Sequence, residues 1–172
     1  MPNTNRDYWE YYLPLLKKIK PKKIVEWGPG MGIDTDFIES GEPGNTKLAI
    51  DNTEAEIACI EHCPKWLPPK SERITPFHIR NENSAEYTSI PKGWENADIF
   101  FVDARNRVRC LNSIFKDATK KTAVVCIHDA ERPRYSPGIN QFKYVLYPHP
   151  RKRFCVMTNS KQKYNQIKKL YS

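Results

Sequence analysis

The sequence predicts an α/β protein whose doubly wound sheet is mostly parallel, with helices on both faces and an antiparallel strand near the C-terminus. Three observations lead to this prediction. Short apolar runs alternate along the chain with segments whose apolar residues have helical spacing. Several runs are apolar throughout, as in parallel strands that are buried on both faces. The first run ends in glycines at alternate positions, Gly28, Gly30 and Gly32, which is typical of a strand that turns into a helix beneath a ligand.

The first half of the chain is expected to form three helices and three strands. In order, a lead-in helix, a strand, a helix, a second strand, a helix and a third strand are predicted over residues 7–20, 24–25, 34–40, 47–51, 54–62 and 73–79. The lead-in helix, within segment 1–21, should break near Pro14, because proline cannot donate an intrahelical hydrogen bond. Its apolar face is expected to pack on the core, with a lid or a homodimer contact as the alternative. The third strand contains Pro76 and is therefore expected toward an edge of the sheet.

The second half is expected to complete the sheet within one domain that covers residues 1–172. A helical turn, a strand, a helix, a strand, a short helix and a closing pair of strands are predicted over 85–89, 97–103, 105–115, 122–129, 138–142, 143–147 and 153–158. Leu111 and Phe115 are expected to face inward from the helix over 105–115. A polar loop over 130–138 is longer than a plain connection. Residues 160–172 form a basic tail with a short helix.

Composition limits the functions that the chain can have. A net charge of +8 on 172 residues permits a polyanionic partner such as nucleic acid, or an acidic small substrate. Basic residues are spread along the chain, however, with some concentration near the C-terminus, so solvated basic faces explain the charge at least as well. The five cysteines, an odd number, fit reduced thiols better than a disulfide framework. No apolar run is long enough to span a membrane, and the first residues lack the apolar core of a secretion signal. These features predict a cytoplasmic protein.

Acidic residues and one histidine stand where the predicted strands end. Glu26 closes the first strand, Asp51 the second, Asp103 the fourth, and His128 with Asp129 the fifth. Because the carboxyl ends of parallel strands meet at one edge of a sheet, these side chains are expected to lie together around a ligand. Asp51 follows the glycines by about twenty residues, the spacing of an acid that binds ribose hydroxyls. A helix cap is the alternative role for Asp51.

The glycine spacing favours a nucleoside ligand without a pyrophosphate. A dinucleotide site has the pattern Gly-x-Gly-x-x-Gly, whereas here Ile33 takes the position of the third glycine. Asp34 and Asp36 follow directly, and carboxylates beside a helix N-terminus would repel a pyrophosphate. A cationic, phosphate-free nucleoside therefore fits better. A glycine-rich turn without any ligand is the alternative.

These segments resemble the class I S-adenosylmethionine-dependent methyltransferases, which have a Rossmann-like fold. The resemblance rests on the Glu-x-Gly-x-Gly-x-Gly run that begins at Glu26, on an acid at the end of the second strand, and on the segments Phe100-Phe101-Val102-Asp103-Ala104 and Val125-Cys126-Ile127-His128-Asp129. The last two are similar to the Val-Asp-Gly and His-Asp signatures of small methyltransferases related to the metal-dependent O-methyltransferases. The resemblance covers roughly residues 20–147.

The resemblance implies S-adenosyl-L-methionine as the cofactor. The cofactor-binding residues that it implies are Glu26, Gly28, Gly30, Gly32, Asp51, Asn52, Asn81 and Asp103. The first four would line the methionine and ribose, Asp51 would bind the ribose hydroxyls, and Asn81 would lie near the adenine. Metal-dependent relatives hold a divalent ion between acids at the ends of the fourth and fifth strands. Asp103, His128 and Asp129 match that place, where two carboxylates and an imidazole could bind Mg²⁺ or Mn²⁺.

The reaction implied is methyl transfer to a hydroxyl oxygen of a small or glycan-like acceptor. Transfer is an in-line displacement, so positioning supplies much of the acceleration. His128 would take the hydroxyl proton as general base, or a metal held by Asp103 and Asp129 would acidify it. The alternatives are a histidine bonded to backbone for His128 and a helix-capping aspartate for Asp103.

Four residues are expected to contact the acceptor, and the arginines among them favour an anionic or hydroxyl-rich molecule: Arg105, Arg132, Arg134 and Tyr135. Ordinary surface arginines are the alternative. Two other functions stay open, a nucleic-acid methyltransferase that uses the basic surface and a non-catalytic binding module of the same fold. The chain lacks the Asn/Asp-Pro-Pro-Tyr/Phe sequence of amino-methylating enzymes, which counts against methylation of a base nitrogen.

Overall fold

The computed structural model describes residues 9–30 and 44–172. Within them, a seven-stranded sheet has the order β3-β2-β1-β4-β5-β7-β6. The strands are β1 (Lys23–Trp27), β2 (Glu56–Glu61), β3 (Ile74–His78), β4 (Ile99–Val102), β5 (Val124–His128), β6 (Tyr144–Leu146) and β7 (Phe154–Thr158). The first five are parallel, whereas β7 is antiparallel to both β5 and β6. The predicted fold class is confirmed, and Pro76 lies in the edge strand β3 as expected.

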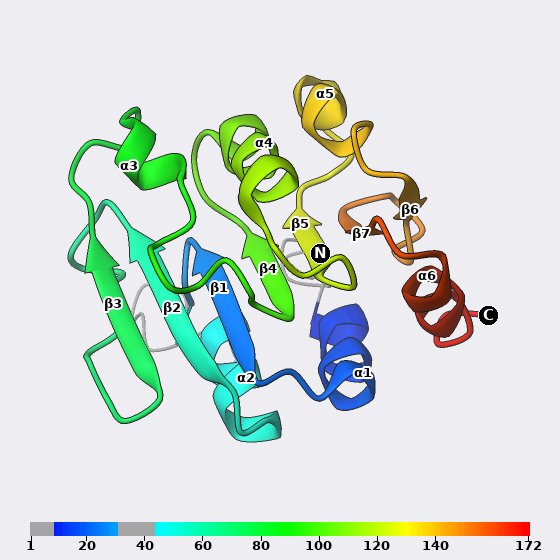
Figure 1. Cartoon of the computed structure of the whole chain (residues 1–172), viewed down its shortest axis with the longest axis horizontal. Coiled ribbons are helices and arrows are strands. Elements are labelled where there is room, and N and C mark those ends of the chain that lie inside the picture. The colour runs from blue at the N-terminus through cyan, green and yellow to red at the C-terminus, as the bar shows by residue number, and fades with distance from the viewer. Residues whose placement is uncertain (1–8, 31–43) are drawn as a thin grey trace, which may run out of the picture.

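Helices cover both faces of the sheet. They are α1 (Trp9–Ile19), α2 (Asn45–Asn52), α3 (Ala85–Thr88), α4 (Arg107–Asp117), α5 (Ser136–Ile139) and α6 (Lys161–Lys168). Figure 1 shows α4 in front of the strands and α2 behind them. Buried side chains of α3, α4 and α5 join one apolar core, and those of α1, α2 and α6 join a second core on the opposite face.

The strands are buried on both sides because successive side chains enter different cores. In β1, Val25 and Trp27 pack in the core beside α4, whereas Ile24 packs in the core beside α2. Glu26 alternates with Val25 and so faces α2, where its carboxyl group is fully buried. A fully buried acid among the apolar residues of β1 is the first sign of a polar site at this end of the sheet.

Two neighbouring segments differ from the prediction. Residues 47–51, expected to form the second strand, lie in helix α2, and residues 54–62, expected to be helical, contain strand β2. Leu48 and Ala49 supply the buried face of α2, and Lys47 pairs with Asp51 one turn later, with 2.8 Å between Nζ and Oδ2. Short apolar runs such as these fit either structure, and tertiary packing decides between them.

Other predictions were wrong in detail. Helix α1 is continuous through Pro14, because the proline removes only the bond to the carbonyl of Glu10, which lies on an exposed residue in the first turn. Phe115 is exposed rather than inward, and its ring packs edge-on against Phe142. The buried residues of α4 are instead Cys110, Leu111 and Ile114. Gly32 and the helix predicted over 34–40 lie outside the described residues.

All five cysteines are free thiols. In the part of the chain that the structure describes, no helix combines the length and apolar character that crossing a membrane requires.

Candidate functional site

A hydrogen-bonded link joins the end of β1 to the first turn of α2. The hydroxyl of Thr46 donates to Glu26 Oε2 at 2.6 Å and accepts from the backbone N–H of Gly30 at 3.0 Å. The N–H of Lys47 donates to the carbonyl of Gly30 at 3.2 Å. The strand, the glycine turn and the helix N-terminus therefore form one rigid unit around the Glu26 carboxyl group.

Glu26 has unused capacity for hydrogen bonding. Among the described residues its Oε1 atom has no hydrogen-bond partner although it is buried, and the same holds for Nδ2 of Asn45. Burial raises the pKa of Glu26 to about 7, against the opposing effects of the hydrogen bond from Thr46 and of the nearby Asn45 amide, which lies too poorly aligned for a hydrogen bond of good geometry. A buried acceptor without a partner is costly, and its position at the end of a parallel strand makes it a candidate for binding a ligand donor.

Gly28 allows the end of β1 to approach β4 closely. Its φ is +77°, and a Cβ atom there would lie 2.2 Å from the carbonyl oxygen of Asp103. Ladder bonds continue to this point, since the N–H of Asp103 donates to the carbonyl of Trp27 at 2.9 Å. Only glycine fits, because both the backbone conformation and the space exclude a side chain. The glycine turn thus lies directly against the residue that closes β4.

Asp51 and Asn52 do not lie at this edge. Asp51 is exposed at the far end of α2 and pairs with Lys47, and the amide of Asn52 donates to the carbonyl of Leu48. Both line a groove of about 720 Å³ at the amino edge of the sheet, beside Lys20 and Lys22, which precede β1. The expected position of Asp51 at a strand end is wrong, because α2 carries it away from the glycine turn.

Glu61 takes the position that was predicted for Asp51. It closes β2 and is buried, and its Oε1 accepts from the N–H groups of His62 and Cys63 at 2.8 and 2.9 Å. His62 Nε2 lies 3.0 Å from Oε2 of Glu82, which follows β3. The sequence signal was an acid directly after the apolar run 57–60, and it was missed because that run was read as helical.

The turn after β3 is held against the start of α4. The amide of Asn106 donates to the carbonyl of Glu82 at 2.6 Å and to Oδ1 of Asn83 at 3.0 Å. Asn81 uses its own Oδ1 to accept from the N–H of Asn83. The turn therefore stands at the same edge of the sheet as the ends of β2 and β4.

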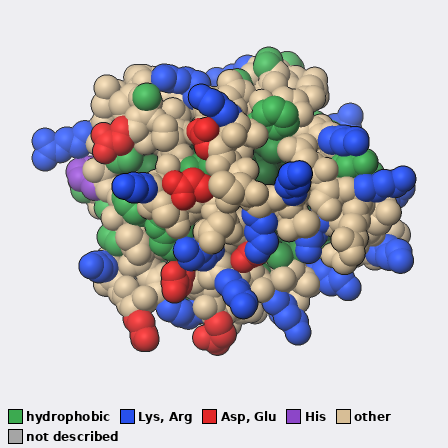
Figure 2. Space-filling view, viewed as in Figure 1, with side chains coloured by type: hydrophobic (Ala, Val, Ile, Leu, Met, Phe, Trp, Pro, Cys, Tyr) green, Lys and Arg blue, Asp and Glu red, His purple; other side chains and the backbone are tan. Residues whose placement is uncertain are grey.

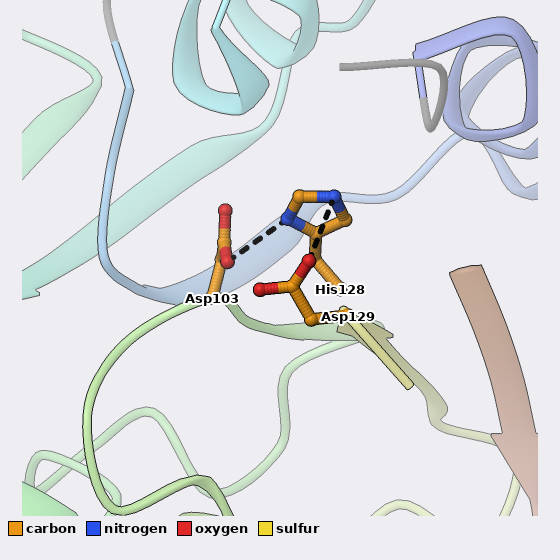
Figure 3. A group of neighbouring side chains, drawn as sticks. All are labelled: Asp103, His128 and Asp129. Atoms are coloured by element: carbon orange, nitrogen blue, oxygen red, sulfur yellow. Dashed lines mark hydrogen bonds and ion pairs between the residues drawn. The ribbon is translucent and has the colours of Figure 1, made fainter. Parts of the chain in front are cut away.

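Three of the predicted site residues lie together at the ends of β4 and β5. One ligand atom from each of Asp103, His128 and Asp129 can be chosen so that all lie within 4.8 Å of one another. Figure 3 shows a carboxylate oxygen of each aspartate directed at the imidazole of His128. Nδ1 of His128 lies 3.1 Å from Asp103 Oδ1, and Nε2 lies 3.7 Å from Asp129 Oδ1.

Neighbouring positive charges keep Asp103 ionised. Burial alone would raise the pKa of Asp103, but the neighbouring His128 and Arg107 outweigh it and hold the pKa below its usual value. Asp103 is therefore a carboxylate at neutral pH. When the N–H at Nδ1 of His128 donates to that carboxylate, the lone pair of the neutral imidazole stands on Nε2.

Guanidinium groups surround the two carboxylates. Nη2 of Arg107 lies 2.6 Å from Asp103 Oδ1 and 3.4 Å from Asp129 Oδ2. Nη2 of Arg132 lies 2.9 Å from Asp129 Oδ2, and Nη2 of Arg153 lies 3.2 Å from Asp129 Oδ1. The donor types of the cluster suit a divalent ion, but these contacts already engage three of the four carboxylate oxygens, Asp103 Oδ1 and both oxygens of Asp129. As arranged, the site does not fit a metal.

Of the residues predicted to contact the methyl acceptor, some lie on the surface and one is buried. Arg105 is exposed, with its Nε 3.6 Å from Glu82, and Arg132 is half-exposed. Tyr135 is buried, and its hydroxyl accepts from Arg107 and Arg134 at 2.8 and 2.9 Å. Tyr135 therefore holds the guanidinium groups of Arg107 and Arg134 through its buried hydroxyl and is not an exposed contact of the loop.

Sequence reasoning missed Arg107 and Arg153. Arg107 follows Asp103 by one helical turn, a spacing that is visible in the sequence. Arg153 reaches Asp129 only because β7 runs antiparallel beside β5, with His128 opposite Phe154. No local pattern indicates that pairing.

Comparisons with known proteins identify the fold. No protein-family model and no curated protein sequence matches this chain. A methyltransferase-like protein from Silicibacter pomeroyi has a TM-score of 0.61 at 14% identity, over 99% of this chain and 95% of its own. CmcI, solved with Mg and SAM, has a TM-score of 0.61 at 16% identity, over 90% of this chain and 72% of its own.

A larger enzyme is also similar. MycE, a methyltransferase of the mycinamycin biosynthetic pathway solved with Mg, SAH and mycinamycin VI, has a TM-score of 0.59 at 13% identity. The match covers 90% of this chain but only 50% of MycE, so this chain spans about half the length of that relative. Likeness at such identities establishes architecture. The chain has the Rossmann-like fold of these methyltransferases.

Proposed function

We propose that this protein is an S-adenosylmethionine-dependent methyltransferase that methylates a hydroxyl oxygen of a small or glycan-like acceptor. One observation carries the proposal. Around the glycine turn of β1, the carboxyl edge of the sheet gathers a buried acid with an unpartnered oxygen, Glu26, and an oriented aspartate–histidine pair, Asp103 and His128. The fold shared with methyltransferases that were solved with SAM or SAH supports it.

The cofactor is proposed to lie over the turn formed by Gly28 and Gly30. Glu26 would accept from its polar groups, and Glu61 would take the ribose hydroxyls in place of Asp51 and Asn52. Gly32 and Asn81 stay predicted contacts, and Asp103 would lie nearby. When bound, the sulfonium supplies an activated methyl group, and the chain contributes position and a proton acceptor.

His128 is the proposed general base. Asp103 orients the imidazole through Nδ1, so that Nε2 can accept the proton of the acceptor hydroxyl. Asp129 stands on the other side of the ring, 3.7 Å from Nε2, and would stabilise the imidazolium that forms. Arg105, Arg132 and Arg134 are proposed to favour an anionic or hydroxyl-rich acceptor.

Turnover tests the proposal. The protein is incubated with S-adenosylmethionine and a panel of hydroxyl-bearing small molecules and glycans, and S-adenosylhomocysteine is measured by mass spectrometry. We expect His128→Gln to lower the rate by roughly 10²–10⁴-fold without weakening S-adenosylhomocysteine binding. His149→Gln, on the connection between β6 and β7, is the control and should keep its rate. Cofactor binding without turnover on any acceptor would favour the non-catalytic binding module.

A nucleic-acid acceptor is the second candidate, and the charge distribution favours it. Residues 132–172 contain ten Lys and Arg and no Asp or Glu. Figure 2 shows Lys and Arg without acidic neighbours on the half of this face that carries β6 and α6, whereas acidic side chains stand on the other half. Retention of the protein on RNA or DNA that falls steeply as salt rises would support this function. Weak retention that does not depend on salt would favour a small-molecule acceptor over nucleic acid.

The five free thiols are consistent with a reducing compartment. We therefore also propose a cytoplasmic location.

A further inference from the structure

The two carboxylates of the candidate metal group are bridged by a guanidinium group. Nη2 of Arg107 contacts both, at 2.6 Å from Asp103 Oδ1 and 3.4 Å from Asp129 Oδ2. We infer that Arg107 occupies the place between Asp103 and Asp129 where a divalent metal would bind, so that this chain keeps the acids of a metal site but excludes the metal.

The other oxygen contacts of Asp129 strengthen the exclusion. Arg153 contacts Oδ1 at 3.2 Å, and Arg132 contacts Oδ2 at 2.9 Å. Both oxygens of Asp129 thus meet guanidinium nitrogens, and Asp103 Oδ1 also faces Nδ1 of His128 at 3.1 Å. A metal that bound these atoms would have to displace several charge-assisted contacts at once.

The charge balance opposes a cation. Three arginines contact the two carboxylates, and one of them, Arg153, also lies 3.9 Å from Glu131, so the negative charge of Asp103 and Asp129 is already balanced by guanidinium groups. A divalent ion would add two positive charges beside guanidinium groups that do not lose their protons. Sites for Mg²⁺ or Mn²⁺ instead offer oxygen ligands whose negative charge is not already neutralised.

Arg107 is held in place from its other side. Its Nη1 donates to the hydroxyl of Tyr135 at 2.8 Å, and its guanidinium carbon lies 5.1 Å from the centre of the Tyr135 ring. Only 11% of the Arg107 side chain is exposed, and Tyr135 is buried. The guanidinium cannot swing into solvent without losing these contacts as well, so it acts as a fixed internal cation.

Direct metal titration tests the inference without turnover. Mn²⁺ binding is followed by electron paramagnetic resonance on the full chain at neutral pH, for wild type, Arg107→Met and the matched control Arg105→Met, whose side chain is exposed near the same helix end. We expect no saturable site in wild type or Arg105→Met at millimolar Mn²⁺. Arg107→Met should gain a single site, at least about tenfold tighter than any binding by wild type. Adding Asp103→Asn to that variant should abolish it.

Two results would overturn the inference. One is a single Mn²⁺ site in wild type that Asp103→Asn removes, which needs no arginine variant and so stands even if Arg107→Met fails to fold. The other is a folded Arg107→Met/Arg132→Met/Arg153→Met variant, checked by circular dichroism, that still binds no Mn²⁺ although all guanidinium contacts to the two carboxylates are gone. Arg107→Lys keeps a positive charge at this place and is expected to stay closed to the metal. Because binding is read directly, failure here is distinct from failure of the proposed methyl transfer.

Discussion

At the scale of single residues, Glu26 couples stability to pH. Its pKa is raised from 4.5 to about 7 because burial disfavours the charged form. The folded chain therefore holds this proton more tightly than the unfolded chain does. The contribution to stability is present below pH 4.5 and is lost as pH rises toward and through 7.

Glu26→Gln should remove this pH dependence. Between pH 5 and pH 8 the wild type should lose roughly 2–3 kcal/mol of unfolding free energy relative to the variant, as measured by urea denaturation at both pH values. The amide can still accept from Thr46, so the variant should fold. Its affinity for S-adenosylhomocysteine should fall at pH 8, where the wild-type Glu26 is mostly ionised, because a charged acceptor is gone. Parallel pH curves for the two proteins would show that Glu26 is ionised alike in both states.

Gly28 offers a second test at this scale. Gly28→Ala should destabilise by roughly 2–5 kcal/mol, from the left-handed backbone and from the clash with the Asp103 carbonyl. Gly93→Ala is the matched control, since Gly93 has a φ of +89° but nothing within 4 Å of an added Cβ. It should lose only about 1–2 kcal/mol. Equal losses in thermal or urea unfolding would mean that the close approach of β1 to Asp103 is absent in solution.

Residues at strand ends were the most predictable part of the site. Glu26, Asp103, His128 and Asp129 each follow an apolar run, and parallel strands bring such residues to one edge. The arginines were less accessible to sequence analysis. Arg153 meets Asp129 only through the antiparallel pairing of β7, a long-range contact that depends on register.

At the scale of elements, helix α2 and strand β2 show where local patterns fail. Residues 47–51 and residues 57–60 are both short runs that contain apolar residues. Each run fits a helix or a strand equally well. The i,i+4 spacing of Lys47 and Asp51 indicates a helix. The prediction that Asp51 binds a ligand favoured a strand end at this position instead. Because residues 47–51 form a helix and β2 follows them, Asp51 lies at the amino edge of the sheet and not at the carboxyl edge. Strands β4 and β5 left no such ambiguity, because their apolar residues are mostly β-branched or aromatic.

The attachment of α2 to β1 can be tested at Thr46. Thr46→Val keeps the shape but removes the hydroxyl that bonds both Glu26 and Gly30. It should cost roughly 1–3 kcal/mol, because it leaves a buried carboxyl group without that donor. Thr46→Ser restores the hydroxyl and should recover most of the loss in urea denaturation. A serine variant as unstable as the valine variant would point to lost packing of the methyl group instead.

At the scale of the whole molecule, the strand order explains why distant segments share one site. With β1 at the centre between β2 and β4, the ends of β2, β1, β4 and β5 form a continuous edge. Alternation of strands and helices predicts a parallel sheet that is covered on both faces, and so the fold class, though not this strand order, was predictable from the sequence. The two cores on either face hold the edge in place.

The central claim is that this carboxyl edge binds the cofactor, with Glu61 in the place first predicted for Asp51. Calorimetric titration of S-adenosylhomocysteine into wild type, Glu61→Gln and Asp51→Asn tests it most directly. We predict micromolar binding to wild type, unchanged binding to Asp51→Asn, and a loss of at least about tenfold in Glu61→Gln, since hydrogen bonds to a charged group contribute about 1.5–3 kcal/mol. No binding to wild type, or a loss confined to Asp51→Asn, would contradict the account.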